Sequence, residues 1–272
     1  MAFLVLFISL RLSTAAHAES FRFVVLSDTH LAMDKGVCGL DSRTGRAVKK
    51  IAGDMKPRFV IHCGDMITAC PGDSEENILS MGDVFRRGVV DKLKESGIGF
   101  FPAPGNHDVA GRGRELYGRV WKGFSNRGFR LDAGDYTQSY AFHYGNSLFV
   151  SLDRSSGDMG ERDVGWLRGL LERSRSRFRH VFVFCHVGLL GSEDKLSERP
   201  VDRELEGVLE RNGVDYFISG HYHVGAEVKV GKTRHIICGA LNTYPYEFLV
   251  FTVDGESVKW ESESAERTAL PF

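Results

Sequence analysis

Short apolar runs rich in β-branched and aromatic residues alternate with stretches of helical periodicity along most of this chain. The runs that predict strands lie at 21–26, 58–61, 98–101, 181–184 and 216–218. The periodic stretches that predict helices lie at 42–52, 75–95, 161–173 and 202–211. Strands that alternate with helices are typical of parallel sheets, so this part of the chain predicts an α/β arrangement.

The pattern changes after Gly220, where apolar runs follow one another without helices between them. These runs lie at 225–230, 234–238, 248–253 and 258–261 and are separated by Gly-Lys and Asp-Gly turns. A further hairpin is predicted at 140–144 and 148–152, joined through Gly145 and Asn146. Helix-covered parallel strands followed by antiparallel strands require two sheets. We therefore expect two packed sheets flanked by helices.

Length and composition fit one catalytic domain without repeats or low-complexity linkers. The chain has 272 residues, of which 42% are apolar and 26% are charged, and its net charge is −1. This length is enough to bury a large core. The near-neutral balance gives no electrostatic reason to expect nucleic-acid or membrane partners, which favour strongly basic surfaces. The sequence does not indicate an oligomeric state.

Polar residues follow five of the predicted strands at the point where each strand ends. They form the motifs Ser-Asp-Thr-His at 27–30, Cys-Gly-Asp at 63–65, Gly-Asn-His-Asp at 105–108, Cys-His at 185–186 and Gly-His-Tyr-His at 220–223. Because ligands bind at the carboxyl ends of strands in open α/β sheets, we expect these side chains to converge. Gly64, Gly105 and Gly220 each precede a candidate ligand, where a small residue permits a sharp turn and a close approach.

Taken in order, the motifs resemble those of the calcineurin-like metallophosphoesterase family over roughly residues 21–240. Within that family the chain is most similar to small single-domain members that hydrolyse cyclic nucleotides and other phosphodiesters. Purple acid phosphatases fit less well, because their pattern has a tyrosine where this chain has Thr68. The resemblance implies a four-layer α/β/β/α sandwich of two mixed sheets.

The resemblance also implies a centre of two metal ions held by seven residues. Asp65 would bridge the ions; Asp28, His30 and His223 would hold one ion, and Asn106, His186 and His221 would hold the other. Mixed nitrogen and oxygen ligands suit iron, manganese, zinc or cobalt better than calcium. Two cations about 3.5–4 Å apart can share a hydroxide that serves as the nucleophile.

Two residues beside Asn106 are predicted to take part without holding a metal. In the family the counterpart of His107 contacts the phosphate, so we expect His107 to be the general acid that protonates the leaving oxygen. Asp108 is expected to fix the loop or the orientation of a ligand.

Other residues of ligand type lack a partner at suitable spacing and are expected to be packed or surface residues. The histidines in this group are His62, His143, His180 and His235. The thiols of Cys63 and Cys185 are expected to turn towards the core, because side chains alternate along a strand.

These residues predict a metal-dependent phosphoester hydrolase, most specifically a phosphodiesterase, whose substrate is a phosphate ester. A phosphomonoesterase or protein phosphatase of the same fold is one alternative. A non-catalytic metal-binding interaction module is the other, although it would have no reason to keep so many clustered ionisable residues. The metals recognise only the phosphoryl group, so the substrate does not follow from the motifs.

The first 18 residues have the pattern of an export signal. An apolar run at 2–10 precedes Ala16-His17-Ala18, which resembles a signal-peptidase site, although no basic residue precedes the run. We therefore expect a periplasmic or secreted mature chain of residues 19–272. In that compartment Cys38 and Cys70, which lie in loops beyond consecutive strands, could form a disulfide.

A segment rich in basic and aromatic residues follows the Gly-Asn-His-Asp motif. Its cationic residues are Arg112, Arg114, Arg119, Lys122, Arg127 and Arg130. We favour a solvated helix and loop anchored by aromatic side chains. The alternative is a cap that attracts an anionic substrate towards the metals.

Overall fold

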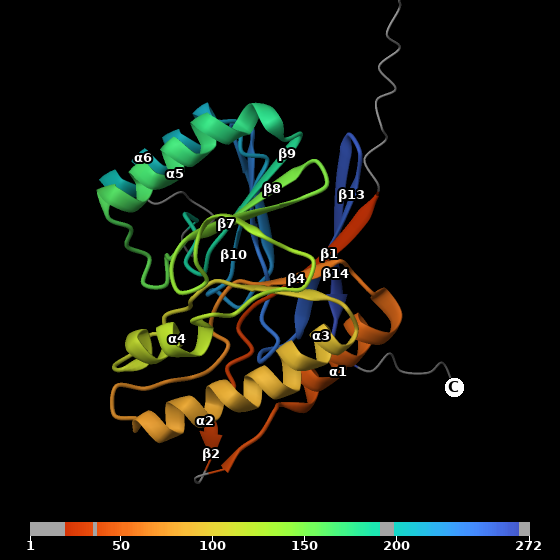
Figure 1. The fold of residues 1–272 in the computed structure, drawn as a ribbon, viewed down its shortest axis with the longest axis vertical. Coiled ribbons are helices and arrows are strands. Elements are labelled where there is room, and N and C mark those ends of the chain that lie inside the picture. The colour runs from red at the N-terminus through yellow and green to blue at the C-terminus, as the bar shows by residue number, and fades with distance from the viewer. Residues whose placement is uncertain (1–19, 35–36, 191–198, 267–272) are drawn as a thin grey trace, which may run out of the picture.

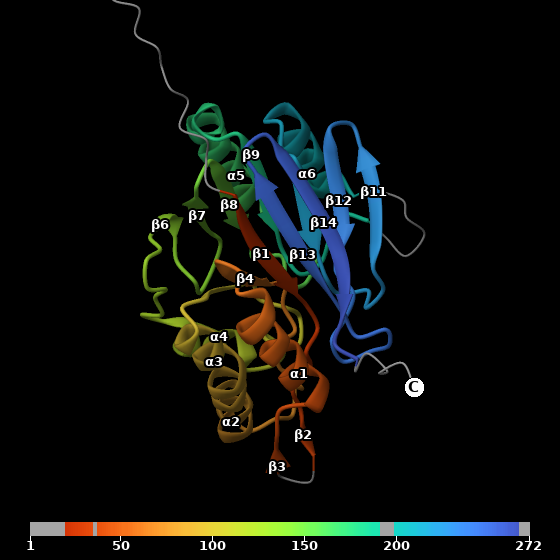
Figure 2. The same cartoon turned by 90° about the vertical axis from the view of Figure 1, so that its right-hand side faces the viewer.

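Two β-sheets packed face to face, with helices on their outer faces, make up the computed structural model (Figure 1, Figure 2). It describes residues 20–34, 37–190 and 199–266. The predicted signal peptide lies outside the described residues. Among the described helices, none is both long enough and apolar enough to cross a membrane. The predicted four-layer α/β/β/α arrangement of two mixed sheets is confirmed.

The smaller sheet contains five strands and joins the start of the described chain to its end. Its order is β14 (Ser257–Ser264), β13 (Glu247–Asp254), β1 (Phe21–Leu26), β4 (Phe59–His62) and β5 (Gly99–Pro102). Strands β1, β4 and β5 are parallel, as expected for strands linked by helices. Strand β13 pairs antiparallel with β1, so the last hairpin completes the first sheet.

The larger sheet contains seven strands. Its order is β11 (Ala226–Val230), β12 (Thr233–Ile237), β10 (Tyr216–Ser219), β9 (His180–Phe184), β8 (Ser147–Ser151), β7 (Tyr140–Tyr144) and β6 (Leu131–Gly134). The expectation that all late strands are antiparallel is wrong for β12, which pairs parallel with β10. After β10 the chain first forms β11 at the outer edge of the sheet, antiparallel to both β10 and β12. Strand β12 then lies between them and runs in the same direction as β10.

Helices cover the outer face of each sheet. Helices α1 (Ser42–Lys50), α2 (Glu75–Phe85) and α3 (Asp91–Glu95) lie beside the smaller sheet, and α5 (Glu161–Ser174) and α6 (Pro200–Arg211) lie beside the larger one (Figure 1). A π-helical turn at Arg86–Val90 joins α2 to α3, so the stretch predicted at 75–95 is continuous. The Ser74 side chain accepts a hydrogen bond from the Asn77 amide and thereby caps α2.

Three short elements were not predicted as separate units. They are the hairpin of β2 (Met33–Asp34) and β3 (Val37–Cys38), helix α4 (Gly113–Trp121) and the edge strand β6. Helix α4 lies within the segment expected to be a helix and loop anchored by aromatic residues, and its Tyr117 and Trp121 are buried. These elements are short, and none has the long periodicity that sequence reasoning detects best.

Aromatic side chains fill the space between the sheets. The rings of Phe23 and Phe251 stack at 4.7 Å, and those of Phe149 and Phe182 stack at 4.8 Å. Phe23 of the smaller sheet meets Phe149 of the larger sheet edge-on at 5.2 Å. Such pairs favour offset or edge-to-face geometry. The two sheets are therefore fixed relative to each other by contacts near their centres.

Strand ends are level within each sheet, and this brings the polar motifs to the same edge. Leu26 pairs with His62, which pairs with Pro102. In the larger sheet, Phe184 pairs with Ile218. Each of these residues lies at or next to the end of its strand, one to three residues before a predicted polar motif.

The five cysteines are free thiols, so the disulfide expected between Cys38 and Cys70 is absent from the structure. Cys38 is partly buried and Cys70 is exposed. Cys63 and Cys185 are fully buried, which confirms that they face the core. Burial raises the pKa of the Cys185 thiol to about 12. The thiols behind the predicted site are therefore protonated and inert at neutral pH.

Acidic partners neutralise part of the basic segment. Arg112 and Arg119 both pair with Glu75 on α2. Arg114 pairs with Asp153, at 2.5 Å between Nη1 and Oδ2. These three arginines thus hold α4 against its neighbours, which supports the interpretation as a solvated helix over that of a substrate-attracting cap.

Candidate functional site

The candidate site lies where the loops after β1, β4, β5, β9 and β10 meet. All seven predicted metal ligands lie in these loops. Five of them are non-glycine residues in the left-handed region, with φ of 52° at Asp28, 47° at His30, 55° at Asp65, 76° at His221 and 61° at His223. Such a conformation costs about 1–3 kcal/mol per residue and is typical of functional sites.

Backbone hydrogen bonds between the loops hold this strained geometry. The Asp28 amide donates to the Gly64 carbonyl at 3.1 Å, and the His30 amide donates to the Asp65 carbonyl at 3.0 Å. The Gly220 amide donates to the His186 carbonyl at 2.9 Å. The loops of each sheet are therefore joined to one another before any side chain is considered.

The three glycines predicted to allow close approach lie at the tightest contacts of the site. A Cβ atom on Gly105 would lie 2.1 Å from the Asp65 amide nitrogen, and one on Gly220 would lie 1.9 Å from Ser27 Oγ. A Cβ on Gly64 would lie 2.7 Å from Gly105 Cα. A larger residue at these positions would push the neighbouring candidate ligands apart.

The first cluster contains Asp28, His30 and His223, with Asp65 beside it. Asp28 Oδ1 lies 3.2 Å from His223 Nε2 and 3.6 Å from His30 Nε2. The two Nε2 atoms are 3.1 Å apart. Asp28 Oδ1 is buried and has no hydrogen-bond partner within the described residues. A buried carboxylate oxygen beside two converging ring nitrogens is a donor set for a cation.

The other oxygen of Asp28 is fixed from behind. Asp28 Oδ2 accepts a hydrogen bond from Ser27 Oγ at 2.5 Å and another from the His221 amide at 3.0 Å. The carboxylate therefore cannot rotate freely, and Oδ1 remains directed at the two imidazoles.

The second cluster contains Asp65, Asn106, His186 and His221. Asp65 Oδ2 lies 3.2 Å from His186 Nε2 and also 3.5 Å from His30 Nε2 of the first cluster. Asn106 Oδ1 lies 2.8 Å from His186 Nε2 and 3.1 Å from His221 Nδ1. Asp65 is thus the residue whose carboxylate faces both clusters.

The electrostatics of the site favour anionic carboxylates among histidines. Burial alone would raise the pKa of Asp28, but contacts with His223 and His30 lower it well below the usual range. Burial likewise opposes the charged form of His186, yet its hydrogen bond to Asp65 raises its pKa to about 9. The carboxylates therefore draw positive charge into a buried site, a role that bound cations can take over.

His107 is partly exposed, whereas Asp108 is buried. The His107 amide donates to Asp65 Oδ1 at 2.8 Å, and its ring centroid lies 4.9 Å from that of His30. Asp108 is buried and accepts hydrogen bonds from the amides of Met66, Ile67 and Gly105, at 2.8–3.0 Å. Burial, together with the charge of Asp65, raises the pKa of Asp108 to about 7.

The other histidines do not belong to these clusters. His62 and His235 are buried within the fold. His180 Nε2 donates to the Gly255 carbonyl at 2.9 Å, and the exposed His143 pairs with Asp132. Among the described residues, none of the four belongs to a group able to hold a metal. This agrees with the interpretation that they are packed or surface residues.

Sequence reasoning missed Arg154, a fully buried arginine that supports the loop after β9. Its Nε donates to the Val187 carbonyl at 2.7 Å, and its Nη2 forms an ion pair with Asp202 at 2.7 Å. The arginine thus fixes the residue that follows His186. An isolated arginine in a Ser-rich loop has no motif that could have identified it.

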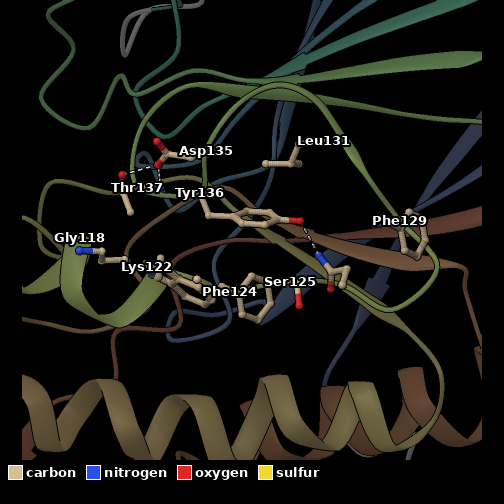
Figure 3. Close-up of a pocket in the computed structure, with 12 residues that line it drawn as sticks. Gly118, Lys122, Phe124, Ser125, Phe129, Leu131, Asp135, Tyr136 and Thr137 are labelled. Atoms are coloured by element: carbon tan, nitrogen blue, oxygen red, sulfur yellow. Dashed lines mark hydrogen bonds between the residues drawn. The ribbon is translucent and has the colours of Figure 1, made fainter.

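A cavity of about 550 Å³ lies away from the site, beside α4 (Figure 3). Its walls include Trp121, Phe124, Phe129 and Tyr136, and the Tyr136 hydroxyl accepts a hydrogen bond from Asn126 at 3.0 Å. Asn126 also exchanges two hydrogen bonds with the backbone of Phe100 and so covers the edge strand β5. None of the predicted site residues lines this cavity.

The fold and the convergence of these motifs define a metallophosphoesterase. The chain belongs to the calcineurin-like phosphoesterase family, whose family model matches residues 21–225. This finding confirms the resemblance carried by the five motifs.

Curated relatives include a serine/threonine-protein phosphatase, CPPED1, from Danio rerio. It is 28% identical over 207 residues, which cover 69% of this chain and 60% of the relative. The protein of the same name from Bos taurus is 28% identical over 198 residues, covering 66% of this chain and 57% of the relative. The chain thus matches rather more than half the length of these relatives.

Solved structures support the fold. A dimetal phosphatase from Danio rerio superposes with a TM-score of 0.67 at 16% identity, covering 90% of this chain and 96% of that one. GAP50, described as the anchor in the inner membrane complex of Plasmodium, gives a TM-score of 0.62 at 14% identity, covering 93% and 87%. At such identities the likeness extends to the fold alone.

Proposed function

We propose that the chain is a phosphoester hydrolase that depends on two metal ions, both of which Asp65 would contact. Asp28, His30 and His223 would hold one ion, and Asn106, His186 and His221 would hold the other. The observation that carries this proposal is the unpartnered, buried Asp28 Oδ1, which faces two imidazole nitrogens only 3.1 Å apart. A cation between the three atoms would receive a lone pair from each of them.

The donor set fits the metals predicted from the sequence. Imidazole nitrogen combined with carboxylate and amide oxygen suits iron, manganese, zinc or cobalt. When bound, two such cations lower the pKa of a water molecule shared between them and neutralise the phosphoryl oxygens. The backbone of the chain supplies rigidity, because Asp65 is tied to His107 and the loop after Asp65 is tied to Asp108.

In this mechanism His107 gives a proton to the oxygen that leaves the phosphorus. Its backbone is held to Asp65 at 2.8 Å, and its partly exposed ring lies beside His30 at the surface of the site. The backbone of His107 is therefore held beside the candidate ligands, while its ring remains accessible to a substrate. Asp108 has no such access, and its part is to hold the Met66, Ile67 and Gly105 backbone in place.

A phosphodiester is the substrate class that we propose, on the basis of the likeness in residues 27–31 and 105–108. A phosphomonoester, such as a phosphoprotein, is the second candidate, and it is favoured by the relatives that are named serine/threonine-protein phosphatases. The same metal cluster can serve either reaction, because it contacts only the phosphoryl group.

An assay with two nitrophenyl esters separates these candidates. For a diesterase, we expect kcat/KM for bis-nitrophenyl phosphate to exceed that for nitrophenyl phosphate in the presence of manganese, iron, zinc or cobalt. The opposite ratio would establish the monoesterase. Hydrolysis of neither ester by protein that holds two ions would favour the non-catalytic module. Addition of a chelator serves as the control, since it should abolish either activity.

We also propose that the chain is exported and that its mature form begins near Glu19. The support is the apolar run followed by Ala16-His17-Ala18. The intact mass of protein recovered from the periplasm or medium should correspond to residues 19–272. A chain that keeps Met1 and stays in the cytoplasm would contradict the proposal. Mass measured before and after reduction and alkylation shows whether Cys38 and Cys70 remain free thiols.

A further inference from the structure

The two histidines of the first cluster are each held from behind by a threonine hydroxyl. His30 Nδ1 lies 3.1 Å from Thr68 Oγ1, and His223 Nδ1 lies 3.2 Å from Thr243 Oγ1. In both rings the opposite nitrogen, Nε2, faces Asp28 and the other imidazole. Thr68 and Thr243 therefore occupy equivalent places on either side of the cluster.

The hydrogen bonds of Thr243 determine which atom carries the proton. Thr243 Oγ1 donates its single proton to Asn242 Oδ1 at 2.9 Å, so its oxygen is left to accept from His223 Nδ1. His223 must then carry its proton on Nδ1, which leaves a lone pair on Nε2. The backbone of Asn242 is itself fixed, because its backbone amide donates to the Asp28 carbonyl at 3.2 Å.

On the other side, the backbone of Thr68 is held in place. Its amide donates to the Leu31 carbonyl at 2.8 Å, which ties it to the residue after His30. Thr68 is partly buried whereas Thr243 is exposed, so water can replace the hydroxyl of Thr243 more easily than that of Thr68.

The second cluster is built differently. His186 Nδ1 donates to the Cys63 backbone carbonyl at 2.8 Å, and His221 turns Nδ1 itself towards Asn106. No side-chain hydroxyl within the described residues holds either ring. A substitution of threonine can therefore affect the first cluster while leaving the second intact.

We infer that Thr68 and Thr243 are positioning residues that set the Nδ1–H tautomer of His30 and His223 and so aim both Nε2 lone pairs at the first metal. This inference rests on the proposed two-metal function. It adds that the histidines of the two ions are oriented by different kinds of partner. Removing a partner of this kind lowers metal affinity by about 10–100-fold. Because both histidines would hold the same ion, the affinity for that ion alone should fall.

The test is manganese binding to chelator-stripped protein that carries Thr68→Val and Thr243→Val. The natural chain should bind two ions per chain and show the electron paramagnetic resonance signal of a spin-coupled pair. The double variant should bind one ion as before and the other about 10–100-fold more weakly. At limiting manganese its signal should be that of an isolated ion. Thr68→Val alone should have a larger effect than Thr243→Val alone.

Two matched controls separate positioning from structure. Thr68→Ser combined with Thr243→Ser keeps both hydroxyls and should restore the coupled signal. Thr233→Val removes another buried hydroxyl, that of Thr233 on β12, which donates to the Val214 carbonyl at 2.9 Å. This variant should bind both ions with unchanged affinity. It measures the general effect of losing a buried threonine hydrogen bond.

The outcomes also separate this inference from the proposed function. If the natural chain binds two ions and the double Val variant binds both with unchanged affinity, the inference is wrong and the metal centre stands. Equal weakening of both ions would likewise overturn it. If the natural chain binds fewer than two ions, the proposed function fails and the inference fails with it.

Discussion

Replacing Asp65 by Ala should remove both metal ions together. The Asp65 carboxylate faces His30 of the first cluster at 3.5 Å and His186 of the second at 3.2 Å, so it serves both ions. Without this carboxylate each cluster loses an anionic ligand, and His186 loses the hydrogen bond that raises its pKa. Elemental analysis of protein purified after exposure to excess manganese should show metal content falling from two ions per chain to nearly none.

Two comparison variants give this prediction its specificity. Asn106→Ala removes a contact of the second cluster alone and should weaken one ion. Asp65→Asn retains an oxygen that can accept a hydrogen bond from the His107 amide but removes the negative charge. It therefore distinguishes the loss of a metal ligand from the loss of loop structure. One ion retained at full affinity in Asp65→Ala would show that the carboxylate does not bridge. Circular dichroism verifies that each variant is folded.

Strand positions were predictable because short apolar runs rich in β-branched and aromatic residues are typical of buried strands. The run at 21–26 coincides with β1, and the hairpin predicted at 140–144 and 148–152 is reproduced by β7 and β8. The pairing of strands was harder to predict. The run at 234–238 predicts a strand, but the parallel pairing of this strand with β10 depends on β11 lying at the edge of the sheet. No local sequence pattern specifies that position.

The same distinction applies to the site. Asp28, Asp65 and His221 could be found because each combines a residue of ligand type with a strand end and a neighbouring glycine or serine. Thr68 and Thr243 could not, since a hydroxyl is common in loops and each contact joins residues 38 or 20 positions apart. Sequence spacing reveals the atoms that contact a metal far better than those that orient them.

Replacing His107 by Ala should lower turnover by roughly 10²–10⁴-fold while leaving fold and metal content near normal. The reason is that its side chain lies beside the metal clusters, whereas the loop is held by the His107 amide, which alanine retains. Turnover of a phosphate ester, metal content and thermal unfolding should be measured on the same preparation. His143→Ala is the matched control, because His143 is exposed and pairs with Asp132 away from the site.

The size of the His107→Ala defect should depend on the leaving group. An alkoxide is a strong base and needs a proton as it departs, whereas nitrophenolate leaves without one, so the alkyl ester should suffer the larger loss. Equal losses on both esters would show that His107 positions the phosphate instead. The ring of His107 also forms a possible metal-holding group with His30 and Asp65. Loss of an ion in the variant would therefore identify His107 as a ligand, because a proton donor can be removed without releasing the metals.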